Sequence, residues 1–428
     1  MSDQPTIESS RIESLDVFRG FALLGILLLN IIGFGLFSPS YSYPAFDLAN
    51  SGSASLVTWT GIELFAEGAM RCLFSILFGA GVLLFTTGDN ARSGLTHYRR
   101  TFWLLVIGLF DAFILLWNGD ILVTYALAGA LLYLARHKSV RALITFASIL
   151  LLLMSILHLL TGFGLSYSYQ AYKDVAAADV RGELTTVTEE QKELAQGWQD
   201  FISDFELNDE QIEAERAARS ESYVSAFNWN AKKTVEVYRF VLPLYLFWDA
   251  LAMMLLGMAL YKANVLQAER SRGFYLKLML AGFTAGLMIN GYEVAHAYSN
   301  QFSIFSTFAQ MQPSYHFGRL GMALGYIGLL GLICKSGVLQ DLTSRLAAVG
   351  RMALTNYLMH SLICAILFTG LGFGLVGQFT RAELYGIVIA IWLLQLGFSP
   401  FWLRHYRFGP IEWLWRALTY GKLPKFRR

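Results

Sequence analysis

Long apolar segments recur along the whole chain and constrain its fold more than any other feature. A helix needs about 20 apolar residues to cross the hydrocarbon core of a bilayer, and ten segments approach that length. Only 15% of the residues are charged, against about 25% in soluble domains. We therefore predict an all-α, polytopic transmembrane bundle of about ten helices. The predicted helices are residues 16–37, 66–87, 101–117, 120–136, 141–163, 237–262, 275–293, 318–336, 348–370 and 384–403.

Lysine and arginine are distributed unevenly between the connecting segments. The facing loops 38–65, 118–120 and 294–317 contain neither residue. Because basic loops stay in the cytoplasm, we expect both termini on the cytoplasmic side and these three loops outside. The basic residues of the opposite loops are Arg92, Arg99, Arg100, Arg136, Lys138, Arg141, Arg270, Arg272 and Arg345.

Two polar segments divide the chain further. Residues 164–236 carry the mixed acidic and basic pattern of solvated helices. We expect them to form an extracytoplasmic acidic helical loop between a five-helix N-terminal half, 1–163, and a five-helix C-terminal half, 237–404. Residues 405–428 form a basic, aromatic cytoplasmic tail. Such a tail suits a helix on the anionic inner leaflet, or equally a cover over the cytoplasmic mouth of the bundle.

Ionisable side chains lie within several of the apolar segments, where they are unfavourable and therefore mark functional positions. Arg19 and Asn30 share one face of the first helix, because their spacing of eleven residues makes about three turns. The pairs Asp16–Arg19 and Glu67–Arg71 also fit purely structural ion pairs, and Arg239 and Arg319 fit snorkelling side chains. The polar positions form a cytoplasmic layer of Asp16, Arg19, Arg351 and Asn356, an outer layer of Glu67, Arg71, Asp111, Asp120, Arg239, Asn290, Glu293, His296, His316 and Arg319, and a middle group of Asp249 and His360.

Composition excludes several classes of protein. The three cysteines, Cys72, Cys334 and Cys364, are scattered through apolar segments and do not form a disulfide framework. No Cys/His cluster has metal-ligand spacing, so we expect no metal. A net charge of +2 gives no reason to expect nucleic acid as a partner. The glycine pairs 79/81, 282/286 and 321/325 predict close helix approach.

Several blocks resemble a bacterial membrane-protein family. The chain is similar to the YeiB family, which has a C-terminal domain of unknown function. Asp111 and His360 depart from that pattern, where His and Gln are expected. The blocks are residues 71–81 (RCLFSILFGAG), 117–122 (WNGDIL), 350–358 (GRMALTNYL) and 408–421 (FGPIEWLWRALTYG).

A second resemblance is confined to the first two helices. Residues 15–20 (LDVFRG) followed by Asn30 resemble the transmembrane acyltransferases related to heparan-alpha-glucosaminide N-acetyltransferase. Asn30 matches an asparagine implicated in acyl transfer in those enzymes. The position of their histidine, eleven residues further on, holds Tyr41.

These resemblances imply a multi-pass protein of the bacterial inner membrane that moves an acyl group from cytosolic acyl-CoA, as co-substrate, to an extracytoplasmic hydroxyl or amine. The acceptor would be a glycan or a lipid-linked molecule at the membrane lipid. A transporter or flippase of a polar or lipid-linked solute is the alternative, and the sequence leaves monomer and homodimer open. The catalytic candidates are Asn30, Asp111, His316 and His296. The binding candidates are Asp16, Arg19, Glu67, Arg71, Asp120, Arg239, Arg319, Arg351 and His360, and the candidate cations for CoA phosphates are Arg99, Arg100, Arg345, Arg351 and Arg416.

Overall fold

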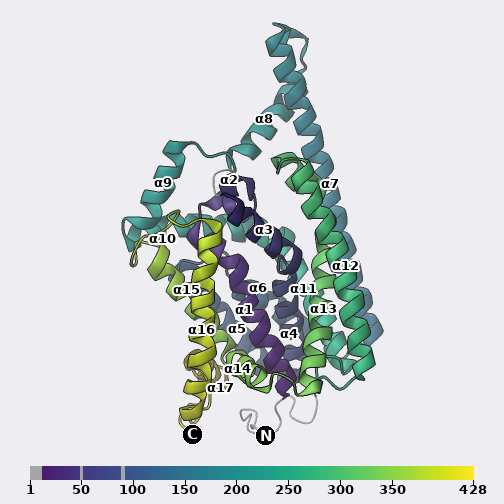
Figure 1. Ribbon diagram of the computed structural model, residues 1–428, viewed down its shortest axis with the longest axis vertical. Coiled ribbons are helices and arrows are strands. Elements are labelled where there is room, and N and C mark those ends of the chain that lie inside the picture. The colour runs from purple at the N-terminus through teal and green to yellow at the C-terminus, as the bar shows by residue number, and fades with distance from the viewer. Residues whose placement is uncertain (1–11, 49–51, 88–91) are drawn as a thin grey trace.

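The protein is a bundle of helices. The computed structural model describes residues 12–48, 52–87 and 92–428, and within these ranges it contains no strand, only one isolated bridge between Tyr406 and Arg427. The all-α prediction is therefore confirmed (Figure 1). The main elements are α1 (Glu13–Gly35), η2 (Ser38–Tyr41), α2 (Ala45–Leu48), α3 (Gly52–Phe65), α4 (Ala69–Thr86), α5 (Gly94–Phe113), α6 (Leu122–Leu132), η3 (Tyr133–Ala135), α7 (Val140–Val180), η4 (Leu184–Thr186), α8 (Glu189–Ser203), α9 (Asp209–Ser220), α10 (Tyr223–Glu236), η5 (Val237–Leu246), α11 (Phe247–Lys262), α12 (Arg272–Ser299), η6 (Ser306–Met311), α13 (Tyr315–Ser336), α14 (Gln340–Arg351), α15 (Ala353–Phe368), α16 (Arg381–His405) and α17 (Pro410–Tyr420).

Enough of these helices can cross a bilayer to make the chain a multi-pass membrane protein. Seven helical segments of the described residues are long and apolar enough, and the bent pair α14 and α15 raises the number to eight. The predicted segments 101–117 and 120–136 correspond to α5 and α6, which are not among them. The apolar part of α6 is short, with 11 residues in its regular helix.

The predicted single helix 348–370 is instead two helices that meet at 81°. Met352 leaves the helical conformation, with φ −111° and ψ 31°. Glu412, from α17, accepts hydrogen bonds from the main-chain amides of Leu354 (2.6 Å) and Thr355 (3.0 Å). The first amides of a helix lack partners within it, so the tail supplies the cap that allows α15 to begin afresh.

The basic loops lie together at one end of the molecule. Lys262 donates to the carbonyl of Arg136 at 2.9 Å, and Arg272 donates to that of Lys335 at 3.2 Å. The C-terminus and the start of α1 lie at this end, whereas α8 and the distal part of α7 project from the other (Figure 1). We call the two ends the basic end and the lid end, and the positive-inside rule predicts that the basic end is cytoplasmic.

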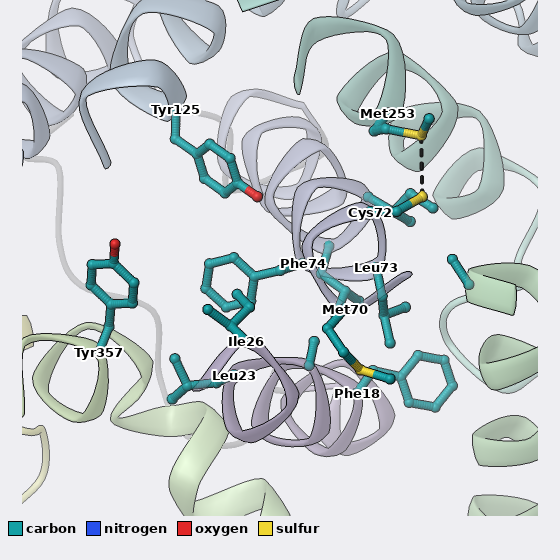
Figure 2. Packing of buried hydrophobic residues seen from close by; sticks show 14 of the residues in the cluster. Phe18, Leu23, Ile26, Met70, Cys72, Leu73, Phe74, Tyr125, Met253 and Tyr357 are labelled. Atoms are coloured by element: carbon teal, nitrogen blue, oxygen red, sulfur yellow. Dashed lines mark hydrogen bonds between the residues drawn. The ribbon is translucent and has the colours of Figure 1, made fainter. Parts of the chain in front are cut away.

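The core lies between α1, α4 and α11. Phe18, Leu23 and Ile26 from α1 face Met70, Leu73 and Phe74 from α4, and Cys72 contacts Met253 at 3.2 Å between the sulfur atoms (Figure 2). Helix α1 packs on α14, α15 and α16 as well as on α4. Helices of the two predicted halves therefore interdigitate around the first span.

Glycines allow the closest helix crossings. A Cβ atom added at Gly79 would overlap the Met254 carbonyl, and one added at Gly257 would overlap the Ile76 carbonyl, so α4 and α11 touch backbone to backbone. Gly282 and Gly321 serve α12 and α13 in the same way. The predicted packing role is confirmed for five of the six predicted positions, and Gly81, where a Cβ atom would meet nothing within 4 Å, is the exception. The five are Gly79, Gly282, Gly286, Gly321 and Gly325.

Candidate functional site

A buried ion pair forms the centre of a polar cluster between α4, α11 and α13. Asp249 on α11 accepts hydrogen bonds from both terminal nitrogens of Arg319 on α13, one of them at 2.8 Å. His316 is three residues before Arg319 and so lies on the same helix face. Its Nδ1 accepts a hydrogen bond from Arg319 at 2.6 Å, which places the ring proton on Nε2. The histidine lone pair is thus already engaged.

Arg71 on α4 joins this pair to a more accessible group. Its guanidinium lies 4.0 Å from the Asp249 carboxylate and donates to the Tyr315 hydroxyl at 3.1 Å. Tyr315 in turn donates to the Glu67 carboxylate at 3.2 Å. The Arg71 side chain is 30% exposed although its helix is central to the bundle. We call Glu67, Arg71, Asp249, Tyr315 and Arg319 the charged cluster.

Tyr41 faces this cluster from the turn after α1. Burial raises the pKa of its hydroxyl, and the charges of Arg71 and Glu67 act on it in opposite directions. The ring is nevertheless 49% exposed, so Tyr41 touches both the cluster and accessible space. The position at which the acyltransferases have a histidine therefore lies beside Arg71 and Glu67.

Asn30, the other residue of that resemblance, is 7% exposed on α1. Its amide forms no hydrogen bond with the described part of the chain, and its polar atoms are not among the fully enclosed side-chain atoms that lack a partner. The amide is therefore accessible and can donate a hydrogen bond to a polar group of a ligand.

Helix α9 fixes the end of α1 that carries Tyr41. Arg219 donates to the main-chain carbonyls of Gly33, Phe34 and Leu36 at 3.1, 2.6 and 2.7 Å. Glu215 accepts from both the amide and the hydroxyl of Ser38 at 2.9 Å. Burial lowers the pKa of Arg219, and the Glu215 carboxylate opposes that shift.

Two of the predicted acids form a separate pair. Asp111 at the end of α5 and Asp120 before α6 are both fully enclosed and act on each other. Asp120 accepts from the amides of Leu122 and Val123 at 3.0 and 2.8 Å. This pair lies outside the charged cluster.

The predicted cytoplasmic layer lies at the basic end. Arg19 donates to Asp16 at 2.9 Å. The Arg100 guanidinium stacks at 4.6 Å over both Phe85 and Trp415, and Arg99 donates to the Leu418 carbonyl at 3.2 Å. The charges of Arg416 and Arg19 act on Arg100, so cations gather where α17 meets α5. Arg351 and Arg345 lie on α14 at the same end.

Three predicted residues are not brought into either group. His296 pairs with Gln310 at 2.8 Å on an exposed part of α12. Arg239 is exposed beside the Phe240 ring. His360 is buried and bonds to Gln395 of α16 at 2.9 Å. Their roles in binding or catalysis stay predictions.

Two members of the charged cluster, Tyr315 and Asp249, are not among the residues that the sequence predicts to bind or to catalyse. The signal for Tyr315 was its position four residues before Arg319, which places both on one face of a helix. Within the described residues, no group of three or more His, Cys, Asp and Glu side chains could hold a metal ion.

The chain is similar to known bacterial proteins over nearly its whole length. A family model described as a protein of unknown function (DUF418) matches residues 260–422. The chain is 32% identical to "Uncharacterized protein YeiB" of Escherichia coli, covering 95% of each chain. It is 30% identical to "Uncharacterized protein YxaH" of Bacillus subtilis, covering 97% of this chain and 96% of the relative. The chain therefore belongs to the YeiB family of membrane proteins.

Proposed function

We propose that the protein is a membrane acyltransferase that moves an acyl group from cytosolic acyl-CoA to a hydroxyl or amine at the lid end. The observation that carries this proposal is the accessible Asn30 amide on α1, which is not engaged by the described chain although the residue is only 7% exposed. Acyl transfer passes through a tetrahedral intermediate whose oxyanion needs fixed hydrogen-bond donors. The Asn30 amide is such a donor on the central helix of the bundle.

Glu67 is the side chain best suited to be the base. Its carboxylate accepts one hydrogen bond from Tyr315 and is only half-buried, whereas the His316 lone pair is taken by Arg319. Glu67 would remove the proton of the acceptor, whose oxygen or nitrogen then bonds to the acyl carbon. The thioester C–S bond breaks, and the proton leaves with the thiolate as the free thiol of CoA.

The cations at the basic end would bind the donor. Phosphate groups prefer arginine, which can present two parallel N–H donors. Arg99, Arg100 and Arg416 lie around α17, with Arg19 close by. This arrangement supports a cytosolic CoA site, with the outer acceptor a glycan or lipid-linked molecule in the bacterial inner membrane.

The test uses the purified full chain with radiolabelled acetyl-CoA. We expect binding at micromolar concentration, and transfer of label to an extracted lipid or glycan fraction. Asn30→Ala should abolish transfer and retain binding, since Asn30 is remote in sequence and depth from the basic end. The control is Asn228→Ala, which alters an exposed amide on α10. Absence of acetyl-CoA binding, or unchanged transfer by Asn30→Ala, would falsify the proposal.

A transporter or flippase is the second candidate. The 81° break between α14 and α15 favours it, because broken helices frame the substrate sites of many transporters. Solute flux in proteoliposomes without an acyl donor would support this function. Solute flux that occurs only with acyl-CoA would instead favour the acyltransferase.

A further inference from the structure

The carboxyl groups of Asp111 and Asp120 meet inside the α5–α6 hairpin. Asp111 is 0% exposed and Asp120 is 2% exposed. Gly108 leaves room for them, since a Cβ there would lie 2.9 Å from the Asp120 carboxylate. Within the described residues, neither acid has a salt bridge with Lys, Arg or His. The charge of this pair is therefore not neutralised by a cation of the described chain.

The two acids have very different hydrogen bonding. Asp120 accepts from the Leu122 and Val123 amides at the positive N-terminus of α6, and from the Tyr357 hydroxyl at 3.3 Å. Neither oxygen of Asp111 meets hydrogen-bond geometry with the described chain. The polar side chains that act on Asp111 are Ser361 and Asp120. Three donors thus stabilise a negative charge on Asp120, whereas only the Ser361 hydroxyl acts in this way on Asp111.

Two adjacent buried carboxylates cannot both be ionised without a large loss of free energy. A proton on one of them removes the repulsion and provides an O–H donor for the other. Asp120 already has donors for both of its oxygens, so the proton belongs on Asp111. We propose that Asp111 and Asp120 form a proton-binding site, which at neutral pH holds one proton on Asp111 facing an ionised Asp120.

The surroundings of the pair contain further unpartnered polar atoms. The Trp117 indole N–H and the Tyr238 hydroxyl are buried without hydrogen-bond partners in the described chain. Trp117 is 2% exposed and lies beside the Tyr357 hydroxyl. Tyr238 lies close enough to interact electrostatically with both acids. The titratable groups that face the pair are thus Tyr357 on α15 and Tyr238 on η5. Neither is a base that could take the proton from Asp111.

A small cavity lies beside Trp117. It has a volume of about 20 Å³ and is lined by Trp117, Asn118, Asn230 and Arg219 among others. That volume is enough for one water molecule. Asn230 donates to the carbonyl of Ala112, next to Asp111, at 2.7 Å. Asn230 therefore links the cavity to the main chain beside Asp111. The proposed proton site does not depend on the proposed acyl transfer.

Infrared difference spectroscopy of the full-length protein in lipid tests the site without acyl donor or acceptor. At pH 7 we expect Asp111 to contribute the carbonyl band of a protonated, buried carboxyl group, shifted by exchange into deuterium oxide. Asp111→Asn should remove this band and leave any contribution of other buried acids, such as Glu293, in place. Asp111→Glu should restore a band at another frequency. Asp47→Asn is the control, because Asp47 is ion-paired with Arg381 at 2.7 Å and should stay ionised.

Persistence of the whole band in Asp111→Asn, or its absence from the wild type at pH 7, would overturn the proposal. If Asp111→Asn does not fold, the Asp111→Glu frequency shift alone decides the assignment. Asp120→Asn should keep the band and shift it, because Asp111 then donates to an amide oxygen. A failure here leaves the acetyl-CoA experiment unaffected, so the two proposals fail separately.

Discussion

The Arg219 guanidinium on α9 donates a 2.6 Å hydrogen bond to the main-chain carbonyl of Phe34 in the last turn of α1. The final carbonyls of a helix lack partners within it, and a cation there is favourable. Because Arg219 also reaches Leu36, the lid end holds the turn that carries Tyr41. Helix α9 is thereby connected, through this turn, to the charged cluster.

Replacing Arg219 should therefore destabilise the protein. Arg219→Ala leaves the buried Glu215 carboxylate without its ion-pair partner, and loss of one partner of a buried pair typically removes about 3–5 kcal/mol. We expect a clearly lower midpoint of thermal unfolding in detergent, together with faster tryptic cleavage between α8 and α10. The control is Arg216→Ala one turn earlier, whose ion pair with Glu213 is largely exposed. Equal unfolding midpoints for the two variants would show that the hydrogen bonds and the ion pair of Arg219 do not stabilise the protein.

The pair Asp249–Arg319 should respond in the same way within the bundle. Asp249→Ala leaves Arg319, which is 1% exposed, without a counter-ion, so we expect a loss of about 3–5 kcal/mol in unfolding free energy. The double variant Asp249→Leu with Arg319→Leu should recover most of that loss, since it removes both charges of the pair and leaves only the partly exposed Arg71 without its contact to Asp249. Asp341→Ala, which breaks an exposed pair with Arg345, is the control. A double variant as unstable as the single one would show that the pair is not the cause.

Glycine 79 provides a test of the α4–α11 crossing. Gly79→Ala forces α4 away from the Met254 carbonyl, and such overpacking typically destabilises by about 1–3 kcal/mol. Gly81→Ala is the matched control on the same helix, because a Cβ there meets nothing within 4 Å. Thermal unfolding of both variants measures the difference. Similar midpoints for the two variants would mean that α4 and α11 can move apart without a loss of stability.

Much of this fold follows from apolar segment length. The spans around α1, α7, α12, α13 and α16 are recognisable because each apolar run exceeds the bilayer thickness. The break at Met352 was not predictable, because its cause is Glu412, which lies 58 residues beyond Leu354. The helix α3 also lies inside the predicted loop 38–65, where polar residues obscured the helical pattern.

The candidate site was only partly predictable. Arg71, Glu67 and Arg319 were assigned to one layer, because depth along a helix follows from residue number. Which helices face one another does not, so Asp249 could not be paired with Arg319 in advance. Tyr315 was overlooked because tyrosine is common at membrane interfaces, and its contacts with Arg71 and Glu67 depend on tertiary packing.

The cap on α15 predicts a specific pH dependence of stability. Burial raises the pKa of Glu412 above 4.5, although hydrogen bonds from Thr355 and Leu354 oppose the shift. Between the unfolded and the folded pKa the native state holds more protons, so this group's contribution to stability decreases as pH rises above about 4.5. Glu412→Gln should remove that contribution. Unfolding midpoints measured from pH 4 to 7 should then fall less with pH in the variant than in the wild type.

The membrane topology can be tested by cysteine labelling. Cys72 and Cys364 are buried and Cys334 is half-buried, so Cys334→Ser gives a quiet background. Asp200→Cys on α8 should react with a membrane-impermeant maleimide in intact spheroplasts, because α8 lies at the lid end. Lys422→Cys, just beyond α17 at the basic end, should react only after permeabilisation. The opposite pattern would reverse the orientation, and would place the arginines around Arg100 out of reach of cytosolic acyl-CoA.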